Sequence, residues 1–176
     1  MRSSGTFRLF LTGFLASGKT TLGQILARDL NVSFLDIDQT LVDQEGMPVL
    51  RIMASKGEPY FRLQERVLLE RLQSLAVVVA TGSGTPASLE NLRLIGGMGE
   101  MVFLHAPWDL IASRLGNKDA VLKPGLSMEA LYQTYLQRLP FYLKARWIVA
   151  PEAGETPEAL ALRIQMLLKG ALSCAT

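Results

Sequence analysis

The stretch GFLASGKTT, residues 13–21, decides the fold class of this 176-residue chain. It contains the phosphate-loop pattern GxxxxGK[ST]. The fixed positions of that pattern are filled by Gly13, Gly18, Lys19 and Thr20. An apolar run over residues 7–11 precedes the loop, and a helical pattern over residues 19–30 follows it. A loop between a strand and a helix points backbone N–H groups and the positive end of the helix at a phosphate. The alternative is a glycine-rich turn that binds nothing.

The chemistry of phosphate loops assigns roles to their residues. Lys19 reaches the β- and γ-phosphates of a nucleotide, and the Thr20 hydroxyl ligates Mg²⁺. We therefore expect ATP as co-substrate and Mg²⁺ as cofactor. The expected nucleotide-binding residues of the loop are Gly13, Ala16, Ser17, Gly18, Lys19, Thr20 and Thr21.

Apolar runs alternate with helical patterns along the rest of the chain. Buried strands are predicted at residues 7–11, 32–35, 76–80, 101–105 and 147–150. Helices are predicted at residues 19–30, 38–45, 48–56, 59–75, 86–95, 108–115, 128–144 and 157–169. This alternation predicts a three-layer α/β fold in which helices cover both faces of a five-stranded parallel sheet. We expect one domain over residues 1–176, with a lid at about 113–127 and an acceptor-binding segment at about 36–66.

The composition excludes several classes of protein. The net charge of +2 comes from 18 basic and 16 acidic residues that form no basic block, so we expect no nucleic-acid partner. No apolar run reaches the roughly 18 residues that span a bilayer. The stretch FRLFLTGFLAS, residues 7–17, resembles a short signal peptide, but Arg8 and Gly13 interrupt it. With Cys174 as the single cysteine, we expect a cytoplasmic protein without membrane contact.

Two carboxylates follow the second predicted strand in FLDID, residues 34–38. Alternation at a strand end would send Asp36 and Asp38 the same way. Carboxylates that face a phosphate loop need a cation or a hydrogen-bond donor nearby. Asp36 is suited to hold Mg²⁺ through water, and Asp38 is suited to orient an acceptor hydroxyl. The alternative for Asp38 is that it only caps the next helix.

Basic residues and glycines supply candidates for binding the acceptor. In GEPYFRLQE, Arg62 and Glu65 are three positions apart on a predicted helix and can pair on its surface. The planar fork of arginine is also well suited to a carboxylate ligand. The glycines of ATGSG, residues 80–84, permit a ligand to approach closely or form a plain turn. Arg138 is either a second carboxylate receptor or part of a solvated helix face.

The other motifs of a GTPase are out of place. A DxxG pattern at residues 43–46 lies inside a predicted helix rather than after a strand. The NKDA sequence at residues 117–120 places its aspartate one position early. Short patterns of this kind often arise by chance. The phosphate loop, the two carboxylates and the two arginines therefore predict a kinase for a small anionic acceptor rather than a GTPase.

Taken in order, GFLASGKTT, FLDID, GEPYFRLQE, VVVATGSG, LKPGL and QRLPFY resemble the shikimate kinases, relatives of the nucleoside monophosphate kinases. The resemblance extends from about Phe7 to Leu168. It implies ATP-dependent phosphorylation of the 3-hydroxyl of shikimate, in the route to aromatic amino acids. We expect the enzyme to be a monomer with a small-molecule substrate.

The resemblance also implies roles for individual residues. The expected shikimate-binding residues are Asp38, Arg62, Gly82, Ser83, Gly84 and Arg138, with both arginines on the carboxylate. Asp36 matches the aspartate associated with Mg²⁺, Arg114 lies near the lid arginine that packs on adenine, and residues 151–155 border the adenine. The expected catalytic residues are Lys19, Asp38 and the lid residue Lys123.

The chain departs from the family pattern at three places. Ser83 stands between Gly82 and Gly84 where three glycines are usual, Lys123 begins KPGL in place of Arg-Pro-Leu-Leu, and Ala16 replaces a common glycine. These changes leave two alternatives open. One is a paralogous kinase for another hydroxy acid such as quinate or gluconate, and the other is a nucleotide-gated binding module with weak catalysis.

Overall fold

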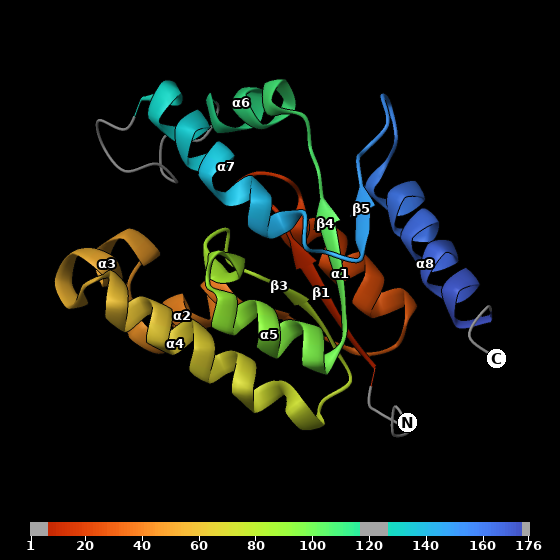
Figure 1. Ribbon diagram of the computed structural model, residues 1–176, viewed down its shortest axis with the longest axis horizontal. Helices are drawn as coiled ribbons and strands as arrows, with labels where there is room; N and C mark the ends of the chain where they lie inside the picture. Colours follow the sequence, from red (N-terminus) through yellow and green to blue (C-terminus); the bar gives the residue numbers. More distant parts are fainter. Residues whose placement is uncertain (1–6, 117–126, 174–176) are drawn as a thin grey trace.

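The computed structural model describes residues 7–116 and 127–173, and the side chains up to residue 170. Its five parallel strands lie in the order β2-β3-β1-β4-β5 (Figure 1). The strands are β1 (Arg8–Thr12), β2 (Ser33–Asp36), β3 (Val77–Ala80), β4 (Glu100–Leu104) and β5 (Trp147–Val149). The helices are α1 (Lys19–Asp29), α2 (Ile37–Glu45), α3 (Val49–Lys56), α4 (Glu58–Arg71), α5 (Leu89–Met98), α6 (Trp108–Gly116), α7 (Met128–Tyr142) and α8 (Pro157–Ser173). The predicted three-layer α/β fold is confirmed.

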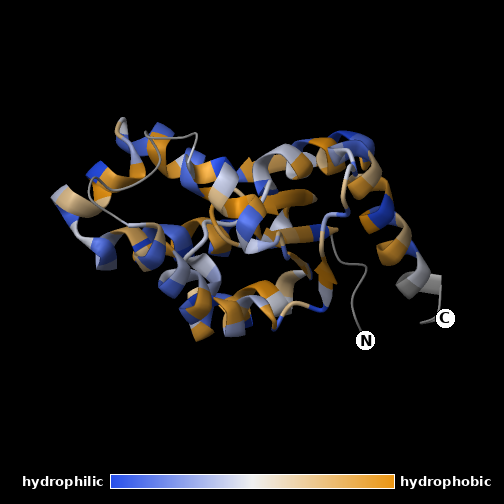
Figure 2. Cartoon of the chain, turned by 90° about the horizontal axis from the view of Figure 1, so that it is seen from above, coloured by the Kyte–Doolittle hydropathy of each residue, from blue (hydrophilic) through white to orange (hydrophobic). Residues whose placement is uncertain are grey.

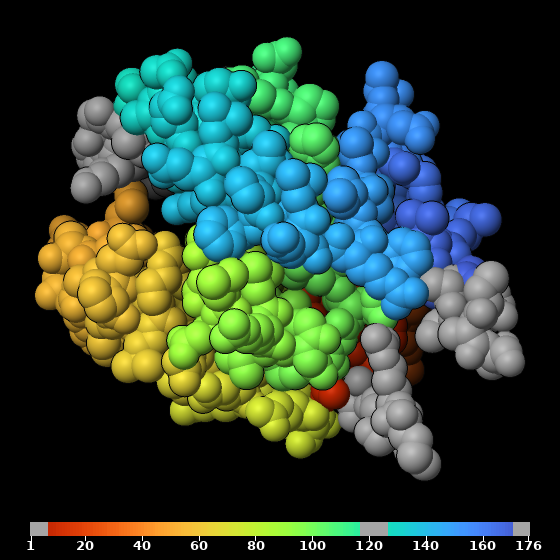
Figure 3. Space-filling model, in the orientation of Figure 1, coloured from red at the N-terminus to blue at the C-terminus, as the bar shows by residue number. Residues whose placement is uncertain are grey.

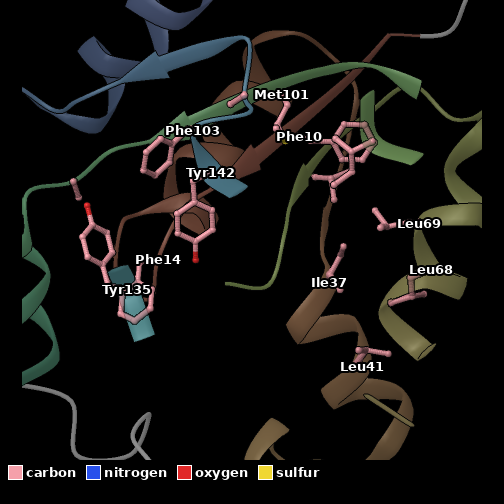
Figure 4. Packing of buried hydrophobic residues seen from close by; sticks show 14 of the residues in the cluster. Phe10, Phe14, Ile37, Leu41, Leu68, Leu69, Met101, Phe103, Tyr135 and Tyr142 are labelled. Carbon is pink, nitrogen blue, oxygen red and sulfur yellow. The ribbon is translucent and has the colours of Figure 1, made fainter. Parts of the chain in front are cut away.

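Alternating side chains of the strands build two hydrophobic layers, and Figure 2 shows the apolar sheet between its helices. Leu9 and Leu11 of β1 face α1 and α8. Phe10, between them, faces the other layer, which α2 to α7 cover. Figure 4 shows this second layer, where Phe103 packs beside Tyr142 with ring centroids 5.2 Å apart. Because both faces of the three central strands are buried, β1, β3 and β4 are largely apolar, as parallel sheets require.

The sheet brings its functional turns to one edge. β1 is central and pairs with β3 and β4, so the loop after β1 lies between the turns that follow its neighbours. Asp36 at the end of β2 is in register with Ala80 at the end of β3. Ligands of open parallel sheets bind at these carboxyl ends.

Most helix bounds agree with the prediction within two residues, α8 runs four residues further to Ser173, and two other predicted helices contain a 3₁₀ turn at one end. Residues 85–87 form a 3₁₀ turn, η2 (Thr85–Ala87), and α5 starts only after Ser88, whose hydroxyl accepts a hydrogen bond from the Asn91 N–H at 3.4 Å. A helix from residue 86 was therefore wrong because Ser88 is the stronger start signal. α4 ends at Arg71, and a 3₁₀ turn, η1 (Leu72–Ser74), completes the stretch.

Within residues 7–116 and 127–173, the helices are too short or too polar for a membrane span. The lid predicted at about 113–127 falls largely outside the described residues, and Lys123 lies there with it.

Candidate active site

The phosphate loop connects β1 to α1, as predicted. Gly13 and Gly18 have φ values of 149° and 101°, which an L side chain rarely adopts. A Cβ on Gly13 would also lie 2.9 Å from the Leu104 carbonyl oxygen. No side chain caps the start of α1, so its first N–H groups face the loop without an intrahelical partner. This arrangement can hold an anion.

Ala16 has a left-handed backbone with φ of 57°, although it is not glycine. The conformation costs an alanine roughly 1 kcal/mol or more. Its carbonyl oxygen accepts a hydrogen bond from Arg114 Nη1 at 2.9 Å. The structure thus brings Arg114 of α6 onto the phosphate loop.

The half-buried Lys19 side chain folds over the same loop. Its Nζ donates to the carbonyl oxygens of Gly13 at 3.0 Å and Phe14 at 2.8 Å. Burial lowers the pKa of Lys19 to about 8, while Asp38 and Asp36 oppose that shift. The ammonium group is therefore close to both carboxylates that follow β2.

Asp36 joins the loop to α2. Thr20 Oγ1 donates to Asp36 Oδ2 at 2.6 Å, and Asp36 Oδ1 accepts from the Gln39 N–H at 3.1 Å. Asp36 is therefore the N-cap of α2, and the capping alternative for Asp38 is wrong. The expectation that both carboxylates extend from a strand is also wrong, because β2 ends at Asp36 and Asp38 lies in the first helical turn.

The Thr20 and Asp36 pair fits a magnesium ion. Mg²⁺ prefers hard oxygen ligands and is usually held by one or two protein groups beside phosphate oxygens and water. A hydroxyl and a carboxylate 2.6 Å apart at the mouth of the loop supply that donor set. The described residues contain no cluster of three or more acidic, histidine or cysteine side chains that would form an all-protein site.

Asp38 lies in a crowded acidic site. Burial, followed by the charge of Glu65, raises the pKa of Asp38 to about 6, while Lys19 opposes the shift. The turn after β3 approaches so closely that a Cβ on Gly82 would be 2.5 Å from Asp38 Oδ1 and 2.7 Å from Glu65 Oε1. Only glycine fits there without displacing a carboxylate.

Arg62 is held by two carboxylates. Its Nη1 donates to Glu65 Oε2 at 2.7 Å and its Nη2 to Glu58 Oε1 at 2.8 Å. The pairing of Arg62 with Glu65 is confirmed, but its placement on the helix surface is wrong, because Glu65 is 0% exposed. The second oxygen of Glu65 accepts a hydrogen bond from the Thr85 hydroxyl, so Glu65 links α4 to the turn after β3. The sequence analysis did not single out Thr85, although its position directly after the glycine turn of residues 82–84 could have indicated it.

Gly84 provides space for this arginine. A Cβ on Gly84 would lie 2.5 Å from Arg62 Nη2. None of residues 82–84 has a positive φ in the described chain, so Ser83 sits between the two glycines without backbone strain. The departure from three glycines therefore leaves the turn intact.

Arg138 of α7 faces Ser83 from the opposite side. Its Nη1 donates to Ser83 Oγ at 2.9 Å, and its guanidinium carbon lies 5.8 Å from the centre of the Phe14 ring. Tyr142, which sequence reasoning did not single out, donates its hydroxyl to the Ser83 carbonyl oxygen at 2.5 Å. Among the described residues no carboxylate pairs with Arg138. A half-buried cation with only neutral partners does not fit the alternative of a solvated helix face.

Two cavities accompany these groups. One, of about 580 Å³, is lined by residues 16–22 of the loop and α1, with Arg114, Pro151 and Glu155 among its other residues. The other, of about 510 Å³, is lined by Arg62, Gly84 and Arg138 among others. In Figure 3, α3 and α4 form one side of this face of the molecule and α6 and α7 the other.

A phosphate loop, a hydroxyl and carboxylate pair for Mg²⁺, a buried carboxylate and two arginines define a P-loop kinase for a small anionic acceptor. Comparison with known proteins narrows this class, because the shikimate kinase family model matches residues 15–169. The chain belongs to the shikimate kinase family, whose members are phosphotransferases with an alcohol group as acceptor.

Individual relatives agree with the family assignment. A shikimate kinase of Caldicellulosiruptor bescii is 34% identical over 159 residues, covering 89% of this chain and 92% of the relative. A shikimate kinase of Aquifex aeolicus is 34% identical over 166 residues, covering 93% and 96%. The structure of a shikimate kinase from Acinetobacter baumannii in complex with shikimate matches with a TM-score of 0.86 at 28% identity, over 94% of each chain.

Proposed function

We propose that this protein transfers the γ-phosphoryl group of ATP to the 3-hydroxyl of shikimate. The observation that carries the proposal is Arg138, a half-buried cation without a carboxylate partner among the described residues, next to Ser83. Such a cation favours an acceptor that brings its own carboxylate. The similarity to a structure described as a complex with shikimate supports the same acceptor.

The nucleotide would bind in the cavity of about 580 Å³ beside the loop. Backbone N–H groups of residues 13–21 and the start of α1 would hold its phosphates, and Lys19 would leave the loop carbonyl oxygens to contact them. Arg114 would lie against the adenine, with residues 151–155 at its border. Thr20 and Asp36 would hold Mg²⁺, which neutralises charge on the phosphates when bound.

The acceptor would lie between Asp38 and the two arginines. With a pKa of about 6, Asp38 is ionised at neutral pH and is basic enough to accept the proton of the attacking hydroxyl. Arg62 and Arg138 would hold the carboxylate of the acceptor, and Gly82, Ser83 and Gly84 would let it approach the sheet. Lys123 of the lid would add positive charge near the transferred group, where the family resemblance implies an arginine.

The same proposal includes a monomeric, cytoplasmic enzyme that uses a small-molecule substrate and contacts neither nucleic acid nor a membrane.

Coupled ADP production tests this function directly. Purified protein with Mg-ATP is assayed without acceptor and with shikimate, quinate or gluconate, and Lys19→Ala serves as the inactive control. We expect ADP release that depends on shikimate and exceeds release with quinate or gluconate by at least about tenfold in kcat/KM. Equal or greater turnover of quinate or gluconate would show that the acceptor is that acid rather than shikimate. ADP release that does not depend on an acceptor would favour a nucleotide-gated binding module with weak catalysis.

A further inference from the structure

Ser83 occupies the middle of the glycine turn and touches α7 through two of its atoms. We propose that Ser83 is a positioning residue, whose hydroxyl holds the Arg138 guanidinium in the orientation that receives the carboxylate of the acceptor. The inference rests on the proposed function for the identity of that acceptor. The positioning itself concerns only contacts between this chain's own residues.

Two donors of α7 meet on Ser83. Arg138 Nη1 donates to the side-chain oxygen at 2.9 Å, and Tyr142 donates its hydroxyl to the backbone oxygen at 2.5 Å. Arg138 and Tyr142 are four positions apart, so they lie on the same face of the helix. Ser83 therefore fixes the position of this part of α7 relative to the turn after β3, and also the rotation of α7 about its own axis.

The Tyr142 contact makes this support rigid. Tyr142 is 0% exposed and packs against Phe103, as Figure 4 shows. Burial raises the pKa of the Tyr142 hydroxyl above its usual range, so the hydroxyl remains a donor at neutral pH. On the other side of Ser83, the Thr85 N–H donates to the Gly82 carbonyl oxygen at 3.1 Å, and Asn91 Nδ2 donates to the Thr85 carbonyl oxygen at 2.9 Å. Ser83 thus sits in a turn that is held from both directions.

The two arginines of the site have different partners before any acceptor binds. Arg62 already pairs with Glu58 and Glu65, so its charge is partly compensated before any acceptor arrives. Arg138 contacts the hydroxyls of Ser83 and Tyr142 and the ring of Phe14, which orient the guanidinium without neutralising it. Ordering a long arginine side chain costs conformational entropy, and a fixed acceptor such as Ser83 Oγ removes part of that cost before the ligand binds.

Kinetics on Ser83→Ala test the role. The hydroxyl is lost while Cβ and the backbone stay, so we expect KM for shikimate to rise about fivefold to tenfold, with kcat within about twofold and KM for ATP unchanged. Ser83→Thr restores the hydroxyl and should bring KM for shikimate back to within about twofold. Ser33→Ala is the matched control, because Ser33 is exposed at the start of β2, at the end of the strands opposite the site, and its loss should leave KM for shikimate unchanged. An unchanged KM for shikimate in Ser83→Ala would overturn the inference.

A second measurement separates this inference from the proposed function. The side-chain N–H signal of Arg138 in ¹⁵N NMR should report a rigid group in the wild type and a mobile one in Ser83→Ala, without any acceptor present. If this change occurs but shikimate is not phosphorylated, the positioning role stands and the acceptor is wrong. If the Arg138 signal is equally mobile in both proteins, the positioning role is wrong whatever the acceptor.

Discussion

Replacing Asp38 by asparagine should stabilise the free protein at neutral pH while removing its kinase activity. The carboxylate is crowded by Glu65 and accepts no hydrogen bond from the described residues, and its pKa is raised from 3.8 to about 6. At about 1.36 kcal/mol for each pKa unit, ionised Asp38 costs the folded state up to about 3 kcal/mol. Asparagine has a similar shape and carries no charge, so Asp38→Asn avoids that cost.

The sign of the pH dependence follows from the raised pKa. The folded state binds the Asp38 proton more tightly than the unfolded state, so its contribution to stability is fully present below about pH 3.8 and is lost as the pH rises through about 6. The two proteins should therefore be nearly equally stable near pH 4. At pH 8 the variant should be more stable by up to about 3 kcal/mol, or about 6 to 12 °C in Tm for a chain of this size.

Urea denaturation at pH 4 and pH 8, followed by tryptophan fluorescence, measures the free energy of unfolding of the wild type and of Asp38→Asn. Asp109→Asn is the matched control, because Asp109 is exposed on α6 and should change stability by less than about 0.5 kcal/mol at either pH. Coupled ADP production on the same preparations should show a loss of at least about a hundredfold in kcat for Asp38→Asn alone. A variant that is no more stable than the wild type at pH 8 would refute the view that Asp38 is held ionised at a cost.

Three further substitutions test other parts of the site. Gly82→Ala should reduce kcat/KM at least about tenfold in the coupled assay, since its Cβ would be 2.5 Å from Asp38 Oδ1; normal activity would show that the turn can move. Arg62→Lys should raise KM for shikimate about tenfold with little change in KM for ATP, because lysine cannot replace the planar fork; an unchanged KM would remove Arg62 from the acceptor site. Ala16→Gly should raise Tm by about 2 to 4 °C by relieving φ of 57°, and a lower Tm would mean that the loop tolerates alanine without strain.

Local signals in the sequence were sufficient for most of the fold. The phosphate loop was predictable because its backbone needs glycines with positive φ at Gly13 and Gly18, and the pattern GxxxxGK[ST] fixes both positions. The strands were predictable because both faces of a parallel sheet are buried, which leaves long apolar runs. Helix ends were less predictable: a helix from Pro86 would need a cap from Thr85, whose hydroxyl donates to Glu65 instead, whereas the Ser88 hydroxyl accepts from a free N–H.

The sequence predicted which residues belong to the site, but it did not predict which of them contact one another. Asp36 and Asp38 could both be nominated, yet the sequence does not show that the strand stops between them and that Asp36 caps the helix. Glu65 was predicted to be a surface partner of Arg62, but it is buried and accepts a hydrogen bond from Thr85, which is 20 positions away in the chain. Contacts of this kind arise only when separate elements pack, so spacing along one helix cannot predict them.

The layer formed by α1 and α8 has a consequence for synthesis of the protein. α1 follows the first strand, whereas its neighbour α8 spans residues 157–173, and together they bury one whole side of the sheet. A nascent chain on the ribosome would expose Leu9, Leu11 and Leu26 to water until α8 has emerged from the exit tunnel. Such a chain offers an apolar surface to chaperones during translation, and its final cooperative folding step must come after residue 168 has been released.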